Sequence, residues 1–161
     1  MRFRLKMLLY LLRHADAETH AQSDEVRELT SKGREQARKV ARFLEAHELH
    51  LSLVLSSPVR RAHDTAQAVA EQMRSELLIT PWLACGMRPE SALEELKAYR
   101  SQTSVMLVGH EPDFSQLAAH LLGLPSNSQF HVRKASLSLI DLPALRGGTG
   151  SLEFSIPCKL M

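Results

Sequence analysis

A continuous apolar run near the start of the chain, residues 7–12 (MLLYLL), constrains the fold more than any other feature. A half-exposed strand or an amphipathic helix would interrupt such a run with polar residues, whereas a central strand covered by helices on both faces would not. The charged pair Arg13-His14 follows at once. A second run of this kind, Ser104–Val108, ends at Gly109-His110. Both runs are therefore predicted to be buried strands.

Helical patterns separate the apolar runs. Thr30-Ser31 predicts the start of an amphipathic helix that continues to about His47. Strands that alternate with helices predict an α/β fold of three layers, in which a central, mostly parallel sheet is flanked by helices. The other predicted helices are about Val59–Met73, Ser91–Tyr99 and Asp113–Leu122, and the other predicted strands are Leu51–Leu55, Leu77–Thr80 and the hairpin Ala135–Leu142 with Ser151–Ile156.

The overall composition favours one soluble domain. The chain has 161 residues, of which 44% are hydrophobic and 24% charged, so we expect a single domain over residues 1–161 and neither a disordered nor a fibrous chain. The formal net charge of +2 is too small to indicate a nucleic-acid-binding surface. The run at 7–12 is too short for a signal peptide and lacks a cleavage site, and no run approaches the roughly 20 apolar residues of a membrane span.

The two cysteines indicate a compartment. Cys85 and Cys158 lie far apart in the sequence and match neither a metal-ligand spacing nor a disulfide framework. This usage is typical of a reducing environment. We therefore expect a cytoplasmic protein that binds neither membrane nor nucleic acid.

Polar residues stand where three predicted strands end: Arg13-His14, Ser56-Ser57 and Gly109-His110. Ligands bind at the carboxyl edge of open α/β sheets, so these segments are expected to meet in one pocket. A neutral imidazole can attack phosphorus, and neighbouring guanidinium groups lower its pKa. Guanidinium forks from Arg13 and from either Arg60 or Arg61 match a tetrahedral oxyanion. Each feature alone is typical of ordinary surface or turn polarity, but their coincidence at successive strand ends predicts a phosphate pocket.

Four segments resemble the histidine phosphatase superfamily. Leu12–Ala15 (LRHA) resembles its Arg-His pair, and Ser56–Ala66 (SSPVRRAHDTA) resembles its Ser-Ser-Pro-x-x-Arg-Ala-x-x-Thr-Ala segment, which selects Arg61 rather than Arg60. Val108–Pro112 (VGHEP) resembles the segment that carries the second active-site histidine, here His110. Leu29–Ala37 is similar to the family's Leu-Thr-x-x-Gly-x-x-Gln-Ala helix start. The resemblance implies a phosphoglycerate mutase-like fold.

The resemblance also implies a mechanism. His14 would attack phosphorus in line, and water would then hydrolyse the phosphohistidine intermediate. Arg13, Arg61 and protonated His110 would stabilise the equatorial oxygens, with a backbone N–H near Glu111 as a further candidate donor. No metal or other cofactor is implied, and the eight histidines include no HExxH or Cys/His ligand spacing. The predicted catalytic residues are thus His14, Arg13, Arg61 and His110.

Within the superfamily the chain resembles the short SixA-type phosphohistidine phosphatases. The similarity lies in Ser23–Thr30 (SDEVRELT) and in Pro157-Cys158. It adds Arg27 as a phosphate ligand, for which a solvated loop charge is the alternative. It further implies a phosphohistidine-bearing protein as partner, either a histidine phosphotransfer domain or a phosphocarrier.

The general acid is an open point. Larger relatives place a carboxylic acid between the second motif and the Gly-His segment, where this chain offers Glu90, Glu94 and Glu95. For Glu94 and Glu95 a solvated helix face is the better interpretation. A phosphorylated imidazole can accept a proton on its distal nitrogen and leave without such an acid, whereas an alcohol cannot. A missing acid would thus favour phosphohistidine substrates.

Other functions stay open at this point. One is a small-molecule phosphomonoesterase of the same superfamily, including a phosphoglycerate-mutase-like enzyme. Another is a module that binds a phosphorylated ligand without turnover. A DNA-binding helical domain conflicts with the alternating strands and the small net charge. The sequence does not indicate an oligomeric state.

Overall fold

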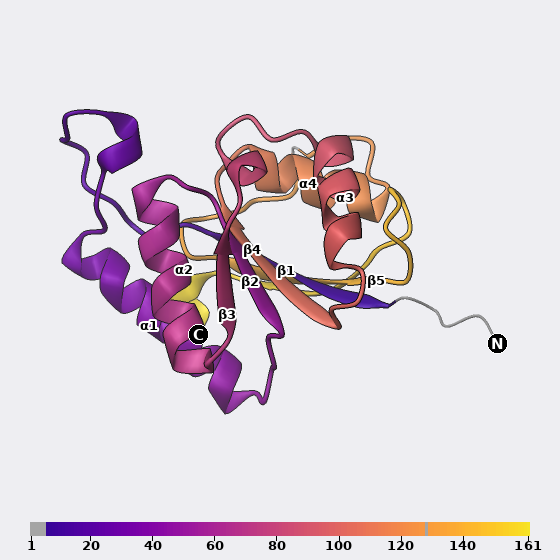
Figure 1. Ribbon diagram of the computed structural model, residues 1–161, viewed down its shortest axis with the longest axis horizontal. Helices are drawn as coiled ribbons and strands as arrows, with labels where there is room; N and C mark the ends of the chain where they lie inside the picture. Colours follow the sequence, from indigo (N-terminus) through magenta and orange to yellow (C-terminus); the bar gives the residue numbers. More distant parts are fainter. Residues whose placement is uncertain (1–5, 128) are drawn as a thin grey trace.

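The computed structural model describes residues 6–127 and 129–161, so the basic start of the chain lies outside the described part. Its centre is a six-stranded sheet with the order β3-β2-β4-β1-β5-β6 (Figure 1). The first four strands pair in parallel, and the last two pair antiparallel, as β1 with β5 and β5 with β6. Their bounds are β1 Met7–Arg13, β2 Leu53–Ser56, β3 Glu76–Ile79, β4 Ser104–Gly109, β5 Leu137–Leu142 and β6 Ser151–Ile156.

Helices cover both faces of the sheet, which gives the three predicted layers (Figure 1). Their bounds are α1 Ser31–Ala46, α2 Arg60–Met73, α3 Pro89–Leu96 and α4 Asp113–Leu122. Short 3-10 turns are η1 Asp24–Val26, η2 Pro81–Leu83, η3 Lys97–Tyr99 and η4 Cys158–Leu160. No helix in residues 6–127 and 129–161 has the length and apolar character needed to cross a membrane.

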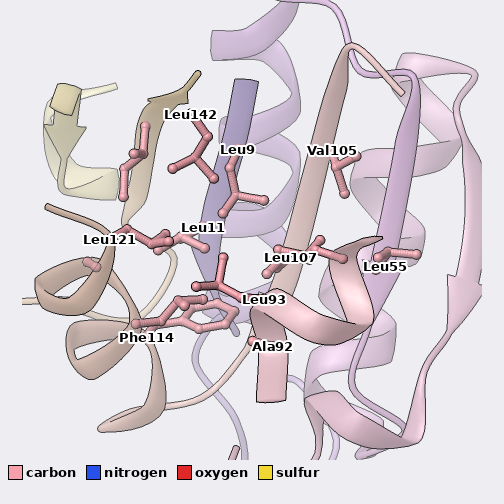
Figure 2. Packing of buried hydrophobic residues seen from close by; sticks show 14 of the residues in the cluster. Leu9, Leu11, Leu55, Ala92, Leu93, Val105, Leu107, Phe114, Leu121 and Leu142 are labelled. Atoms are coloured by element: carbon pink, nitrogen blue, oxygen red, sulfur yellow. The ribbon is translucent and has the colours of Figure 1, made fainter. Parts of the chain in front are cut away.

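Alternate residues of the central strands enter two separate cores. Leu9 and Leu11 of β1 pack with α3 and α4, and Figure 2 shows Phe114 and Leu93 of these helices against them. Tyr10 and Leu12 point to the other face and pack with α1 and α2. Because helices cover both faces of the sheet, the β1 side chains that point to either face are apolar. The apolar run at residues 7–12 is therefore uninterrupted.

Several predicted boundaries differ from the structure, among them both ends of β3 and the starts of three other elements. The strand predicted from Leu51 begins at Leu53, directly after Ser52, whose hydroxyl donates to the Ser104 carbonyl at 2.5 Å. The helix predicted from Ser91 begins at Pro89, a residue whose fixed φ suits the first helical position. The strand predicted from Ala135 begins at Leu137, because Ala135 has a φ of 54° and cannot extend a strand.

Candidate active site

Three strand ends meet at one edge of the sheet. β1 and β2 both lie beside β4, and their last residues pair with its end, as Arg13 with Gly109 and Ser56 with Val108. The residues that follow these strands, His14, Ser57 and His110, are all buried. The structure therefore brings together the segments whose convergence the sequence predicted.

His14 is held in one tautomer by its surroundings. Its Nδ1 lies 2.8 Å from the carbonyl oxygen of Ala15, which can only accept a hydrogen bond. Nδ1 must therefore carry the proton, and Nε2 keeps its lone pair. The Nε–H of Arg61 points at that lone pair from 3.4 Å. The imidazole thus presents a nucleophilic nitrogen beside a cation.

The environment of His14 keeps this imidazole neutral. Its pKa is lowered from 6.5 to about 3, mainly by burial and further by the charges of Arg61, His110 and Arg13, whereas the bond to Ala15 acts in the opposite direction. The sequence predicted a lowered pKa from guanidinium groups. The direction agrees, but burial is the larger cause.

His110 lies beside His14, with ring centroids 5.4 Å apart. Its Nε2 is 2.7 Å from the Ser57 hydroxyl, and its buried Nδ1 has no hydrogen-bond partner. Burial and then Arg61 lower its pKa to about 4. This low pKa favours a neutral His110 ring at neutral pH, whereas the sequence led us to expect a protonated ring beside the phosphoryl oxygens. A phosphate dianion bound next to it would raise this pKa, because an opposite charge favours the protonated ring.

Arg61 lies at the start of α2 and is the most constrained cation of the pocket. Its side chain is only 6% exposed. Asp24 binds it twice, because the Asp24 backbone carbonyl accepts from Nη1 at 2.8 Å and the carboxylate accepts from Nη2 at 3.0 Å. The preceding residue, Arg60, is 51% exposed and pairs with Glu28 at 2.9 Å. The placement thus agrees with the choice of Arg61 over Arg60.

Asp24 links Arg27 to the pocket. The other oxygen of its carboxylate accepts from Arg27 Nη1 at 2.9 Å, while Arg27 Nε donates to the Glu18 carbonyl at 2.6 Å. The guanidinium groups of Arg27 and Arg61 lower the pKa of Asp24, and Arg27 has the larger effect. Burial acts in the opposite direction. Arg27 is therefore a fixed charge, one carboxylate away from Arg61, rather than a freely solvated one.

Arg13 forms the wall between this pocket and a neighbouring cleft. Its Nη1 donates to the Val132 carbonyl at 3.0 Å, and its buried Nε has no hydrogen-bond partner. Burial lowers the pKa of the guanidinium, but this group stays charged at any pH at which the protein is folded. An unpartnered N–H on a cation is a donor that an oxyanion can use.

Two further residues fix the backbone of the pocket. The Thr65 hydroxyl accepts from the Ala15 amide at 3.0 Å and donates to the Arg61 carbonyl at 2.7 Å, so that α2 is tied to the residue after His14. Gly33 of α1 packs so closely on Asp16 that a Cβ at this position would overlap the Asp16 carbonyl oxygen. These contacts explain why the segments of the second and fourth motifs contain Thr and Gly there.

Sequence reasoning missed Asp24 as a member of the site and assigned no role to Ser57. Asp24 stands in the same Ser23–Thr30 segment that pointed to Arg27, three residues earlier, so its spacing held a usable signal. Ser57 was expected at the pocket with the other strand ends, but no partner was predicted for it. Its bond to His110 depends on the pairing of β2 with β4, which the local sequence does not specify.

The candidate acids lie away from these contacts. Glu90, Glu94 and Glu95 are all exposed on α3, and Glu94 pairs with Lys97 at 2.6 Å. Within the described residues, none of the three forms a hydrogen bond or ion pair with a pocket side chain. In the same part of the chain, no group of three or more His, Cys, Asp or Glu side chains is arranged to hold a metal ion.

The arrangement defines a class of protein. A model of the histidine phosphatase superfamily (branch 1) matches residues 9–84, which hold His14 and Arg61. An uncharacterized protein of Picosynechococcus sp. is 30% identical over 91% of this chain and 89% of its own length. The chain belongs to the histidine phosphatase superfamily.

Among its relatives, the SixA proteins are similar over nearly the whole chain. Phosphohistidine phosphatase SixA of Escherichia coli is 29% identical over 96% of both chains. A solved structure of the protein histidine phosphatase SixA complexed with tungstate superimposes with a TM-score of 0.85 at 27% identity, covering 96% of this chain and 100% of that one. The phosphoglycerate mutase-like α/β fold and the SixA-like character predicted from the sequence are thereby confirmed.

Proposed function

We propose that the protein is a phosphohistidine phosphatase that works through a phosphorylated His14 and needs no metal. The observation that carries this proposal is the His14 tautomer, since a proton fixed on Nδ1 by the Ala15 carbonyl leaves Nε2 free to attack. With its pKa lowered to about 3, the ring is a free base at every pH at which phosphohistidine persists. His14 can therefore act as a nucleophile without a separate general base.

In the first step, His14 Nε2 forms a bond to phosphorus while the bond from phosphorus to the substrate nitrogen breaks. The distal nitrogen of the substrate imidazole takes a proton from solvent before the bond breaks, so the released nitrogen keeps the bonding electron pair and the imidazole leaves neutral. Arg13 and Arg61 balance the charge on the equatorial oxygens, and His110 takes up a proton as that charge arrives. In the second step, water attacks phosphorus, which releases inorganic phosphate and restores neutral His14.

The surroundings of the pocket support a nitrogen leaving group. An alkoxide needs a proton from a carboxylic acid, but Asp24, whose carboxylate is bonded to Arg61, is ionised because Arg27 and Arg61 lower its pKa. The α3 carboxylates are exposed and have no bond to the pocket. An imidazole leaving group makes no such demand. The SixA relatives, which carry the name phosphohistidine phosphatase, support the same choice.

The test is a comparison of substrates. Purified protein is incubated with histidine-phosphorylated phosphotransfer domains, histidine-phosphorylated phosphocarriers and a set of small phosphomonoesters, and kcat/KM is measured for each. We expect at least one phosphohistidine protein to exceed every phosphomonoester by an order of magnitude or more. A higher value for a sugar phosphate or a phosphoglycerate would instead assign a small-molecule phosphomonoesterase. Binding without turnover of any of them would assign a phospho-ligand binding module.

A further inference from the structure

A cleft of about 630 Å³ lies on the far side of Arg13, between α1, the 131–134 segment and η4. We call it the basic cleft. Its walls hold two carboxylates and three times as many cationic side chains, namely Arg13, Lys32, Lys39, Arg133, Lys134 and Lys159. The excess of four positive charges is larger than the net charge of +2 of the whole chain. Positive charge is therefore concentrated here, while the rest of the chain is net negative.

The two carboxylates of the cleft neutralise only a small part of this charge. Asp16 accepts from Lys134 at 2.8 Å, and its other oxygen is occupied by Thr30. Glu35 is turned to two arginines that do not line the cleft, Arg38 at 3.2 Å and Arg42 at 2.5 Å. Within the described residues, five of the six cleft cations form no ion pair with a carboxylate, namely Arg13, Lys32, Lys39, Arg133 and Lys159.

The cleft shares one residue, Arg13, with the proposed active site. Arg13 lines it and stands next to His14 in the chain. The 131–134 segment is bonded to the same strand end, because the Val132 carbonyl accepts from Arg13 and the Ala135 amide donates to the Arg13 carbonyl at 3.1 Å. A molecule whose phosphoryl group reaches His14 therefore has the basic cleft beside it.

The length of the cleft suits a short stretch of polypeptide. Lys32 and Lys39 are seven residues apart on α1, which is two helical turns, or roughly 10 Å along one face. An extended chain covers that distance with about three residues. Apart from His131, the described residues that line the cleft offer no aromatic ring on which a base of a nucleic acid would stack.

We propose that the basic cleft binds an acidic segment of the phosphohistidine-bearing protein, which sits next to the phosphohistidine presented to His14. This inference rests on the proposed function and adds to it how the protein substrate is selected. The cleft attracts substrates with several carboxylates near the phosphohistidine and steers them toward the pocket. A small phosphorylated molecule bound at His14 does not extend into the basic cleft, so the cleft does not increase its affinity.

The test uses two synthetic peptides that each carry one phosphohistidine, flanked by Asp and Glu in one peptide and by Ser and Gln in the other. The variant is Lys39→Glu/Lys159→Glu, which changes two cations of the cleft, one on α1 and one on η4. We expect the wild-type protein to prefer the acidic peptide about tenfold in kcat/KM at low ionic strength, and salt to reduce the preference. The variant should lose the preference but hydrolyse the neutral peptide within twofold of the wild-type rate.

A matched control is Arg100→Glu/Arg146→Glu, which makes the same change in net charge at two exposed arginines outside the cleft. It should keep the wild-type preference. Lys39→Ala/Lys159→Ala, which removes the charges without adding repulsion, should reduce the preference by about threefold and guards against a folding defect in the charge-reversal variant.

A binding measurement separates this proposal from the proposed function. Fluorescence anisotropy with the labelled acidic peptide, lacking phosphate, should give binding to the wild type and at least tenfold weaker binding to Lys39→Glu/Lys159→Glu, even if no phosphohistidine peptide is hydrolysed. Equal binding to both proteins would overturn the proposal. The proposal would also be overturned if a single-stranded oligonucleotide bound the wild type more tightly than the peptide does and did not bind the variant. The cleft would then be a nucleic-acid site.

Discussion

Arg60 and Arg61 are adjacent in sequence, but their environments differ so much that replacing each by alanine tests the assignment of the pocket. Arg61 is buried against His14 and Asp24, whereas Arg60 is half exposed and pairs with Glu28 at the surface. The two substitutions remove the same side chain from the same helical turn. Only Arg61→Ala removes a donor from the proposed phosphate site.

The expected magnitudes follow from these contacts. Loss of one donor to a developing oxyanion costs about 3 kcal/mol of transition-state stabilisation, which lowers kcat by about two orders of magnitude. Arg60→Ala removes a surface ion pair worth about 0–1 kcal/mol of stability and should leave kcat within twofold. Arg61→Lys keeps the charge without the planar fork and should fall between the two alanine variants.

The assay is steady-state hydrolysis of one phosphorylated substrate by all four proteins, with far-UV circular dichroism and urea unfolding to show that each is folded. A folded Arg61→Ala protein that retains a fifth or more of the wild-type kcat would refute the role of Arg61. A larger loss in Arg60→Ala than in Arg61→Ala would show that the second motif is misplaced by one residue.

Three further predictions concern the charges of the site. Asp24→Asn removes a negative charge that competes with a bound oxyanion for Arg61 and Arg27, so vanadate should inhibit this variant a few-fold more strongly than the wild type. Weaker inhibition would show that the carboxylate chiefly orients Arg61. The lowered pKa values of His14 and His110 make the folded state bind fewer protons than the unfolded state, so the free energy of unfolding decreases as the pH drops below 6.5. For His14 the decrease between pH 7.5 and pH 5 is about 2 kcal/mol. Urea unfolding should show this decrease in the wild type but not in His14→Asn, and identical pH dependences would contradict the neutral buried ring. Excess chelator should leave turnover unchanged, because guanidinium and imidazole groups carry the charge balance, and activity that vanished with chelator and returned with a divalent cation would contradict the mechanism.

Much of the fold could be predicted because its signals are local. The apolar run at 7–12 becomes β1 because helices cover both of its faces, and the Thr30 cap begins α1 where the pattern places it, accepting from Gly33 at 2.9 Å. The hairpin of β5 and β6 also forms as expected. Boundaries shifted where one residue overrides a pattern, as with the left-handed backbone of Ala135.

The rest depends on contacts between distant segments. Asp24 joins Arg61 across 37 residues of sequence, and Lys134 joins Asp16 across 118, so neither pairing leaves a periodic signal. The basic cleft likewise gathers cations from four segments, and all of these cations except Arg13 are ordinary solvated charges in the sequence. Burial of His14, the main cause of its low pKa, is also a property of the assembled fold.

The central claim, a phosphorylated His14, is tested most directly by trapping that intermediate. Labelled phosphohistidine protein is mixed with His110→Ala, which keeps the nucleophile but lacks a cationic helper, and is quenched in alkaline denaturant before peptide mapping. Acid would cleave the P–N bond, because a protonated ring is a good leaving group, whereas alkali spares it. We predict label on His14 that is lost in acid and stable in alkali, with none in His14→Ala/His110→Ala. Label on any other residue, or label that survives acid, would contradict the account.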